Sequence, residues 1–209
     1  MKRLAVLAVL AWPCFAGSAA VAARPITLYT TYRQAPPEGV EDALHEELAS
    51  IMGPSGIGFT WRALAAPHDR EISIELAVIR FRGRCDTGDL LPIRINPGAL
   101  GWTHVSDGTI LPFSDVDCDR VRDFVQRDLL NLPAEARPAV FGRALARVLA
   151  HELYHIFANT LKHGSCGVGK ASYTVEELLS DRFSFEEKES DALRAGKPQG
   201  AIDGGSGGS

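Results

Sequence analysis

The chain has 209 residues, of which 45% are hydrophobic and 23% are charged, and its formal net charge at pH 7 is −4. This apolar content is enough for one domain with a sizeable core. The acidic balance excludes the basic stripe that nucleic acids or anionic membranes require. No segment approaches the roughly 20 apolar residues of a membrane span. We therefore expect a single domain whose partners include neither nucleic acid nor a spanned membrane.

The first 23 residues have the pattern of a secretory signal peptide. Lys2 and Arg3 precede an apolar run that reaches Trp12, and small residues end the segment at Ala23. Cleavage there removes two basic residues and no acidic one, so 20 basic and 26 acidic residues remain and the charge becomes −6. The segment predicts a secreted or periplasmic protein.

Three strands and one helix are predicted in the next part of the chain. The stretch 24–34 is rich in β-branched and aromatic residues and predicts a strand, and 57–63 predicts another. Between them, apolar residues at helical spacing over 40–52 predict an amphipathic helix. A third strand reaches Phe81, and its alternating pattern predicts that one face is buried. The alternating apolar residues are Ile72, Ile74, Leu76 and Val78.

Two short stretches follow that can form the rim of a cleft. Residues 92–96 (Pro-Ile-Arg-Ile-Asn) can form a strand, and Asp107-Gly108 between two apolar runs predicts a hairpin over 101–113. A strand at the rim of a cleft can bind a peptide by pairing with its backbone. Either stretch is a candidate for that role.

Two helices are predicted after the hairpin. Asp117 or Asp119 can cap a helix that runs to about Leu130. Pro138 suits the first turn of a longer helix that runs to about Asn159. At 1.5 Å per residue the second helix is roughly 33 Å long, which is enough to cross the domain and form the floor of a site.

The longer helix carries the pattern His151-Glu152-Leu-Tyr-His155. Residues four apart project from one helix face, so the two imidazoles can bind one metal ion while Glu152 borders the same site. Neutral imidazoles suit Zn²⁺, and a catalytic zinc site has three protein ligands and a position open for water. Glu152 can then accept the proton of that water as it attacks a carbonyl. Apolar neighbours favour this interpretation, because buried histidines and glutamates are costly unless something satisfies them.

The third ligand must come from the chain that follows the helix. His163 lies eight residues past His155, and a continued helix would carry it about 12 Å further along the axis. The chain must therefore turn back, and Asn159 tolerates the left-handed conformation that such a turn requires. His163 is the predicted third ligand. The alternative is Glu177, with Asp181 orienting a ligand histidine.

Two other side chains can contribute to the chemistry or stability of the domain. Tyr173 is a candidate for stabilising an oxyanion. Three cysteines follow the signal segment, and in an oxidising compartment we expect Cys85 to pair with Cys118. Cys166 then remains free, close to His163 in the sequence.

The motif at His151 resembles that of the zincin metalloproteases. The segment from His155 through His163 to Ala171 is similar to a bacterial metzincin-like group in which His-x-x-x-Gly-Ile-Met-x-Ala follows the helix. Metzincins usually place the third histidine six residues after the second, whereas the spacing here is eight, and Gly169 stands where the related pattern has a methionine. The run from Glu177 to Asp181 instead resembles thermolysin-like gluzincins. The resemblance implies a twisted sheet above an active-site helix.

Together these features predict an α+β, zincin-like fold in which a twisted mixed β-sheet packs over a long active-site helix. We expect one domain at 24–190 and a disordered Gly/Ser-rich tail at 191–209. The predicted function is that of a secreted zinc-dependent metalloprotease acting on a peptide or protein substrate. The alternatives are a catalytically inactive zinc-containing binding module and a metallohydrolase of a non-peptide amide.

Overall fold

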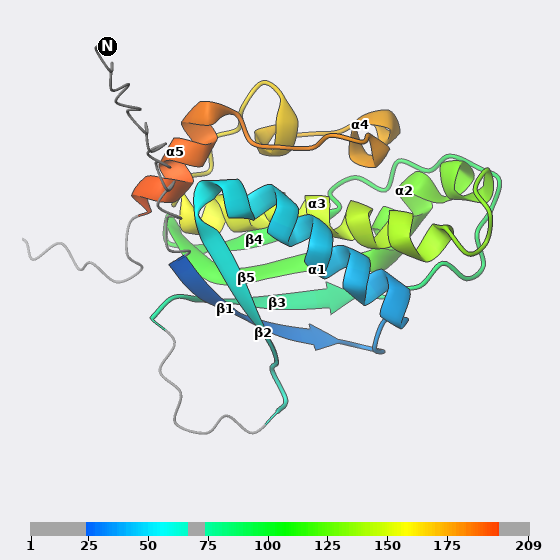
Figure 1. Cartoon of the computed structure of the whole chain (residues 1–209), viewed down its shortest axis with the longest axis horizontal. Helices are drawn as coiled ribbons and strands as arrows, with labels where there is room; N and C mark the ends of the chain where they lie inside the picture. Colours follow the sequence, from blue (N-terminus) through cyan, green and yellow to red (C-terminus); the bar gives the residue numbers. More distant parts are fainter. Residues whose placement is uncertain (1–23, 67–73, 197–209) are drawn as a thin grey trace, which may run out of the picture.

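The computed structural model describes residues 24–66 and 74–196, and in this part the chain folds into one sheet with its helices on one face (Figure 1). The predicted signal peptide and the residues after 196 lie outside the described ranges. None of the described helices is long and apolar enough to cross a membrane.

The sheet has five strands in the order β2-β1-β3-β5-β4. Strand β1 is parallel to β2 and β3, and β3 is parallel to β5, whereas β4 is antiparallel to β5 and forms an edge. The sheet is therefore mixed, as the sequence predicted. The strands are β1 (Arg24–Tyr32), β2 (Ile57–Ala63), β3 (Leu76–Arg82), β4 (Gly101–Ser106) and β5 (Thr109–Asp117).

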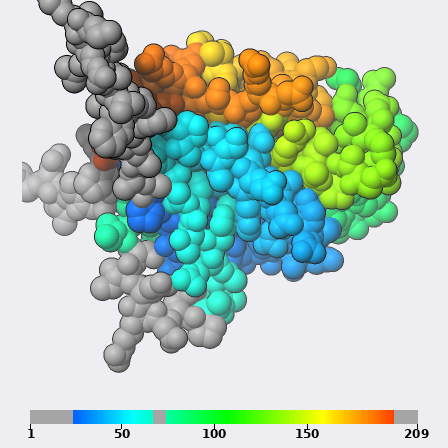
Figure 2. All heavy atoms as spheres, in the orientation of Figure 1, coloured from blue at the N-terminus to red at the C-terminus, as the bar shows by residue number. Residues whose placement is uncertain are grey.

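Five α-helices and two short 3₁₀ turns complete the described chain. The long helix α3 lies between the sheet and the C-terminal segment, which runs along it and carries α4 and α5 (Figure 1). In the space-filling view this segment forms a continuous layer next to α1 (Figure 2). The helices are α1 (Glu38–Met52), α2 (Cys118–Leu130), α3 (Arg137–Phe157), α4 (Val175–Leu179) and α5 (Glu187–Ala195), with turns η1 (Gly53–Ser55) and η2 (Gly167–Gly169).

Helix α3 is held against α1 and α4 by one close approach and one buried cation. A Cβ on Gly142 would collide with the carbonyl oxygen of Val40, so the absence of a side chain lets α1 and α3 touch. Arg147 is 1% exposed and binds Glu47 of α1 at 2.6 Å. Its Nη1 donates to the carbonyl of Leu178 at 2.8 Å. Both contacts fix the axis of the helix that carries the histidine motif.

The cap of α2 and the disulfide agree with the sequence predictions. The Asp117 side chain accepts a hydrogen bond from the Arg120 backbone N–H and caps α2. Cys85 and Cys118 form a disulfide, which ties the loop after β3 to the first residue of α2. Cys166 is free and exposed.

The alternating pattern before Phe81 predicted the wrong face of β3. The residues of β3 that point into the core are Ala77, Ile79 and Phe81, while Val78 lies on the opposite face and Ile74, before the strand, is 93% exposed. Ile72 is outside the described residues. The pattern misled because Val78 and Ile79 are both apolar, and the outer face of this sheet also carries apolar side chains.

Three other segments also differ from the sequence-based expectation. Residues 92–96 form a loop instead of a strand, because prolines flank the two isoleucines and proline cannot donate to a strand ladder. Helix α4 ends at Leu179, earlier than the predicted Phe183. Residues 191–195, predicted to belong to the disordered tail, are instead helical, since α5 runs to Ala195 and its Leu193 is fully buried.

Candidate metal site on helix α3

Two histidines of α3 present their Nε2 atoms to one another. His151 and His155 are 9% and 6% exposed, and their Nε2 atoms are 3.0 Å apart. The rings meet edge to face, with centroids 4.6 Å apart. A spacing of four residues on one helix face produces this proximity, as the sequence predicted.

The turn after α3 returns the chain toward this pair. Asn159 has a positive φ of 47°, and its N–H donates to the carbonyl of Ile156, while the N–H of Thr160 donates to the carbonyl of His155. These two bonds are those of a Schellman motif, which reverses the chain at a left-handed residue. The predicted left-handed turn at Asn159 is therefore confirmed.

The reversal places His163 beside both helix histidines. Its ring stacks on His151 at a centroid distance of 5.3 Å and meets His155 edge to face at 4.9 Å. One nitrogen from each of the three rings lies within 4.8 Å of the others. His163 is exposed, so the cluster opens toward solvent on its side. In the described part of the chain, no other group of three or more metal-binding side chains comes this close together.

The hydrogen bonds of the two helix histidines determine which ring nitrogens carry protons. Nδ1 of His151 lies 2.8 Å from the carbonyl oxygen of Val168, and Nδ1 of His155 lies 2.7 Å from that of Thr160. A carbonyl oxygen only accepts, so both Nδ1 atoms are donors. Burial lowers the pKa of His151 to about 4 and also lowers that of His155, which keeps both rings neutral at pH 7.

The two facing Nε2 atoms therefore both carry lone pairs. Two acceptors 3.0 Å apart repel unless something electron-deficient lies between them. Tetrahedral zinc with Zn–N bonds of roughly 2.0 to 2.1 Å brings ligand nitrogens to a similar mutual distance, and imidazole is a preferred ligand. The donor set of His151, His155 and His163 fits such an ion.

Glu152 borders the histidines and is buried in a way that favours its neutral form. It is 5% exposed, and desolvation raises its pKa to about 7. The hydroxyl of Thr103, on β4, lies 2.8 Å from Oε2 of Glu152 and opposes that rise. A carboxyl group that gains and loses a proton near neutral pH is suited to acid and base chemistry.

The edge strand β4 approaches α3 at this point because Gly101 has no side chain. A Cβ there would lie 2.9 Å from Val148 and 3.1 Å from Oε1 of Glu152. A cavity of about 530 Å³ opens beside the strand, and its wall includes His151, Glu152 and Tyr173. The cavity, the edge strand and the carboxyl group of Glu152 thus share one rim.

Glu177 and Asp181 lie apart from the histidine cluster. The carboxylate of Glu177 pairs with Lys170 at 2.5 Å and accepts a hydrogen bond from the backbone of Thr174 in a capping box. Asp181 is exposed, and the Nδ1 atoms of the helix histidines are bound by backbone carbonyls in its place. The structure brings together the predicted set with His163 and leaves the alternative set dispersed.

Tyr173 lines the cavity with its side chain, but its hydroxyl supports a histidine. Its hydroxyl donates to the carbonyl of Val168 and lies 2.9 Å from Nδ1 of His151. Because the hydroxyl proton is engaged in this bond, the arrangement does not present it as an oxyanion donor. Tyr173 instead fixes the ring orientation of His151 together with Val168.

A buried glutamate of α5 holds the loop that supplies these contacts. Glu189 is 1% exposed, and its carboxylate lies where a Cβ on Gly164 or Gly169 would be. The N–H of Gly164 donates to the carbonyl of Gly169 at 2.6 Å and closes the loop between them. Sequence reasoning did not identify Glu189, because it lies in a charged run that is typical of an exposed helix. The two glycines close to His163 were the signal of a tight approach.

Comparisons with known proteins give limited similarity. No family model matches this sequence, and no curated protein matches it. Among solved structures, archaemetzincin from Methanopyrus kandleri is similar with 13% sequence identity over 83% of this chain and 94% of that chain, at a TM-score of 0.46. At this identity and overlap the likeness assigns neither a family nor a function to the chain.

Proposed function

We propose that the protein is a zinc-dependent metallopeptidase, with His151, His155 and His163 as ligands and Glu152 as the general base. The observation that carries the proposal is the pair of facing Nε2 atoms, 3.0 Å apart, whose rings both donate through Nδ1 to backbone carbonyls. This arrangement orients two lone pairs toward one point, and His163 brings a third nitrogen to it. Such a set suits a divalent cation better than a proton.

The residues around the cluster suit hydrolysis of a carbonyl compound. When bound, zinc supplies an activated water and polarises the carbonyl group of the substrate. Glu152 accepts the proton of the attacking water and returns it to the leaving nitrogen, which a pKa of about 7 allows in both directions. Thr103 holds Oε2, so Oε1 is the oxygen that remains to exchange the proton.

The edge strand favours a peptide as substrate. In the described residues no strand pairs with the outer edge of β4. This strand lies beside the site, because its Thr103 hydroxyl binds the carboxyl group of Glu152. An extended peptide can bind there by adding a strand, which would bring its backbone carbonyls past the site. This observation favours peptide hydrolysis over hydrolysis of another amide.

We also propose that the protein works in an oxidising compartment, as a secreted or periplasmic enzyme. The Cys85–Cys118 disulfide supports this, because disulfides are rare in proteins of reducing compartments. The predicted signal peptide points to the same location. Detection of the processed chain in the culture medium or periplasm, with its N-terminus near residue 24, tests the proposal.

Zinc content and peptide cleavage together test the function. Wild-type protein is expected to bind one zinc per chain and to cleave an unbiased peptide library. Glu152→Gln keeps the zinc and loses cleavage, because only the base is removed. His163→Ala loses zinc, whereas Glu177→Ala, the matched control, retains it.

The alternatives give different results in the same experiment. Zinc binding without cleavage by the wild type would favour an inactive binding module. Activity on simple amides without cleavage of any peptide would favour the non-peptide hydrolase. Wild-type protein without bound zinc would refute the proposed centre altogether.

A further inference from the structure

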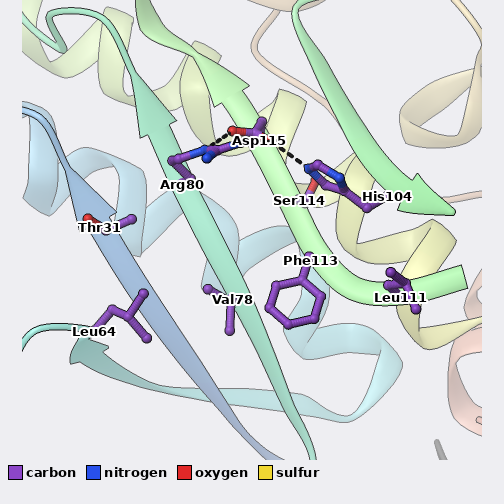
Figure 3. A pocket seen from close by; sticks show the side chains of 9 residues that line it. All are labelled: Thr31, Leu64, Val78, Arg80, His104, Leu111, Phe113, Ser114 and Asp115. Carbon is purple, nitrogen blue, oxygen red and sulfur yellow. Dashed lines mark hydrogen bonds and ion pairs between the residues drawn. The ribbon is translucent and has the colours of Figure 1, made fainter. Parts of the chain in front are cut away.

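A second cavity lies on the face of the sheet opposite to α3. Ala77 and Ile79 of β3 point into the core under the helices, so Val78 and Arg80, which alternate with them, point to the other face. There a cavity of about 380 Å³ is lined by residues from β1, β3, β4 and β5 (Figure 3). The volume is within the range of small-molecule sites. This cavity is separate from the histidine cluster and takes no part in the proposed hydrolysis.

One half of the cavity is a hydrocarbon surface. Its wall is formed by Leu64, Val78, Leu111 and Phe113, which form a row across the lower half of the view, below Arg80 and Asp115 (Figure 3). Phe113 is 45% exposed and Leu64 is 43% exposed. Several large apolar side chains gathered in one hollow mark a surface that gains free energy when hydrocarbon covers it.

The other half is a charged group built around Asp115. This residue is 1% exposed, and its carboxylate binds Nε and Nη2 of Arg80 and lies 2.6 Å from Nε2 of His104. Burial raises the pKa of Asp115, but the hydrogen bonds from Arg80 and His104 outweigh this and hold it below its usual range. Asp115 is therefore ionised, and it fixes the positions of two nitrogen-bearing side chains (Figure 3).

Arg80 retains donors that Asp115 does not use, whereas His104 donates its one N–H to Asp115 through Nε2. A guanidinium has five N–H groups, and Arg80 donates two of them to Asp115, which leaves three. The Arg80 side chain is 57% exposed and that of His104 is 40% exposed. Within residues 24–66 and 74–196, no acceptor binds the remaining N–H groups of Arg80. The polar end thus offers preoriented donors beside an apolar wall.

We propose that this cavity binds a small organic monocarboxylate with an aromatic or branched hydrocarbon body. The carboxylate accepts hydrogen bonds from the N–H groups of Arg80 that Asp115 leaves unused, and the hydrocarbon covers Val78, Leu111 and Phe113. The ionised Asp115 cancels the formal charge of Arg80, so binding rests on the directed N–H groups of the guanidinium and on the apolar wall, and a ligand with more than one negative charge is disfavoured. The hydrocarbon wall disfavours fully hydrated anions such as phosphate, which cannot use it.

The test compares 4-phenylbutyrate with its uncharged analogue 4-phenylbutanol. Calorimetry measures the affinity of each compound for the full-length protein, and methyl NMR locates where it binds. The acid is expected to bind at least tenfold more tightly than the alcohol. Its addition should shift the methyl resonances of Val78 and Leu111 and leave that of Val148, near the histidine cluster, unchanged. Equal affinity for both compounds, no binding of the acid, or shifts only at Val148 would overturn the proposal.

Three variants localise the binding. Arg80→Gln removes the donor fork and should weaken acid binding at least tenfold. Phe113→Glu places a repelling carboxylate in the cavity with the same result, and it is expected to fold because Phe113 is nearly half exposed. Arg82→Gln, an exposed residue of the same strand that does not line the cavity, is the matched control and should bind as the wild type. Undiminished binding by Phe113→Glu in a folded state would overturn the proposed location.

Discussion

Replacing the proposed general base should stabilise the metal-free protein at alkaline pH. Burial raises the pKa of Glu152 from 4.5 to about 7 in the folded state. A raised carboxyl pKa means that the folded state holds the proton more tightly than the unfolded chain does. The ionised carboxyl group of Glu152 therefore lowers the free energy of unfolding. This effect is absent below about pH 4.5, grows as the pH rises, and is complete above about pH 7.

The magnitude follows from the difference of 2.5 between these two values of the pKa. At 1.36 kcal/mol for each unit of pKa, the ionised Glu152 destabilises the metal-free fold by about 3 kcal/mol at pH 8. Glutamine resembles the protonated carboxyl group and can still accept the bond from Thr103. We therefore expect Glu152→Gln to exceed the wild type in stability by about 3 kcal/mol at pH 8 and by less than about 1 kcal/mol at pH 5.

Urea unfolding of chelator-treated protein between pH 5 and 8 measures this difference. The histidines act in the opposite direction, because the lowered pKa values of His151 and His155 make stability rise as the pH increases toward 6.5. The comparison between variant and wild type cancels that contribution. Glu46→Gln, at an exposed position of α1, is the control and should follow the wild type. A Glu152→Gln curve parallel to the wild-type curve would refute the reasoning.

Three further substitutions test the framework around the site. Gly169→Ala places a methyl group against the Glu189 carboxylate, so calorimetry should find weaker zinc binding, whereas Gly53→Ala, with open space around it, should bind normally. Arg147→Leu leaves Glu47 without its buried partner and should lower the free energy of unfolding by about 3 kcal/mol. Urea titration measures this loss, and an unchanged unfolding midpoint would contradict it. Cys85→Ala removes the disulfide that closes a loop of sequence separation 33, and the free energy of unfolding should fall by about 3 to 4 kcal/mol. Adding a reductant should destabilise the wild type and leave this variant unchanged, because the variant has no disulfide to reduce.

Much of the fold was predictable because its patterns are local. The helix over 40–52, the hairpin after Gly101 and the long helix from about Pro138 each follow from spacing, turn residues or proline placement, and the structure confirms them. The face of β3 was not predictable from alternation, because burial depends on which side the helices cover. That choice is made by the packing of α1 and α3, which no single strand encodes.

The histidine cluster was predictable for a different reason. Its first two members are fixed by helix geometry, and the third follows from the requirement for a third ligand together with a residue, Asn159, that can reverse the chain. The partners of Nδ1 were not predictable. They are carbonyl groups of Val168 and Thr160, and a backbone carbonyl is present at every position and leaves no mark on the sequence.

This use of backbone carbonyls makes the site depend on the shape of two loops. A side-chain carboxylate can adjust its rotamer to a histidine, whereas the carbonyl of Val168 is directed only by its own backbone. That backbone is fixed by the N–H of Val168, which donates to the carbonyl of Ser184, and by the Glu189 carboxylate against Gly169. The segment after residue 180 therefore determines how well His151 is oriented, although it supplies no ligand. A chain ending before α5 should keep the histidine motif and its helix but hold zinc less tightly, because the orienting acceptor would no longer be fixed.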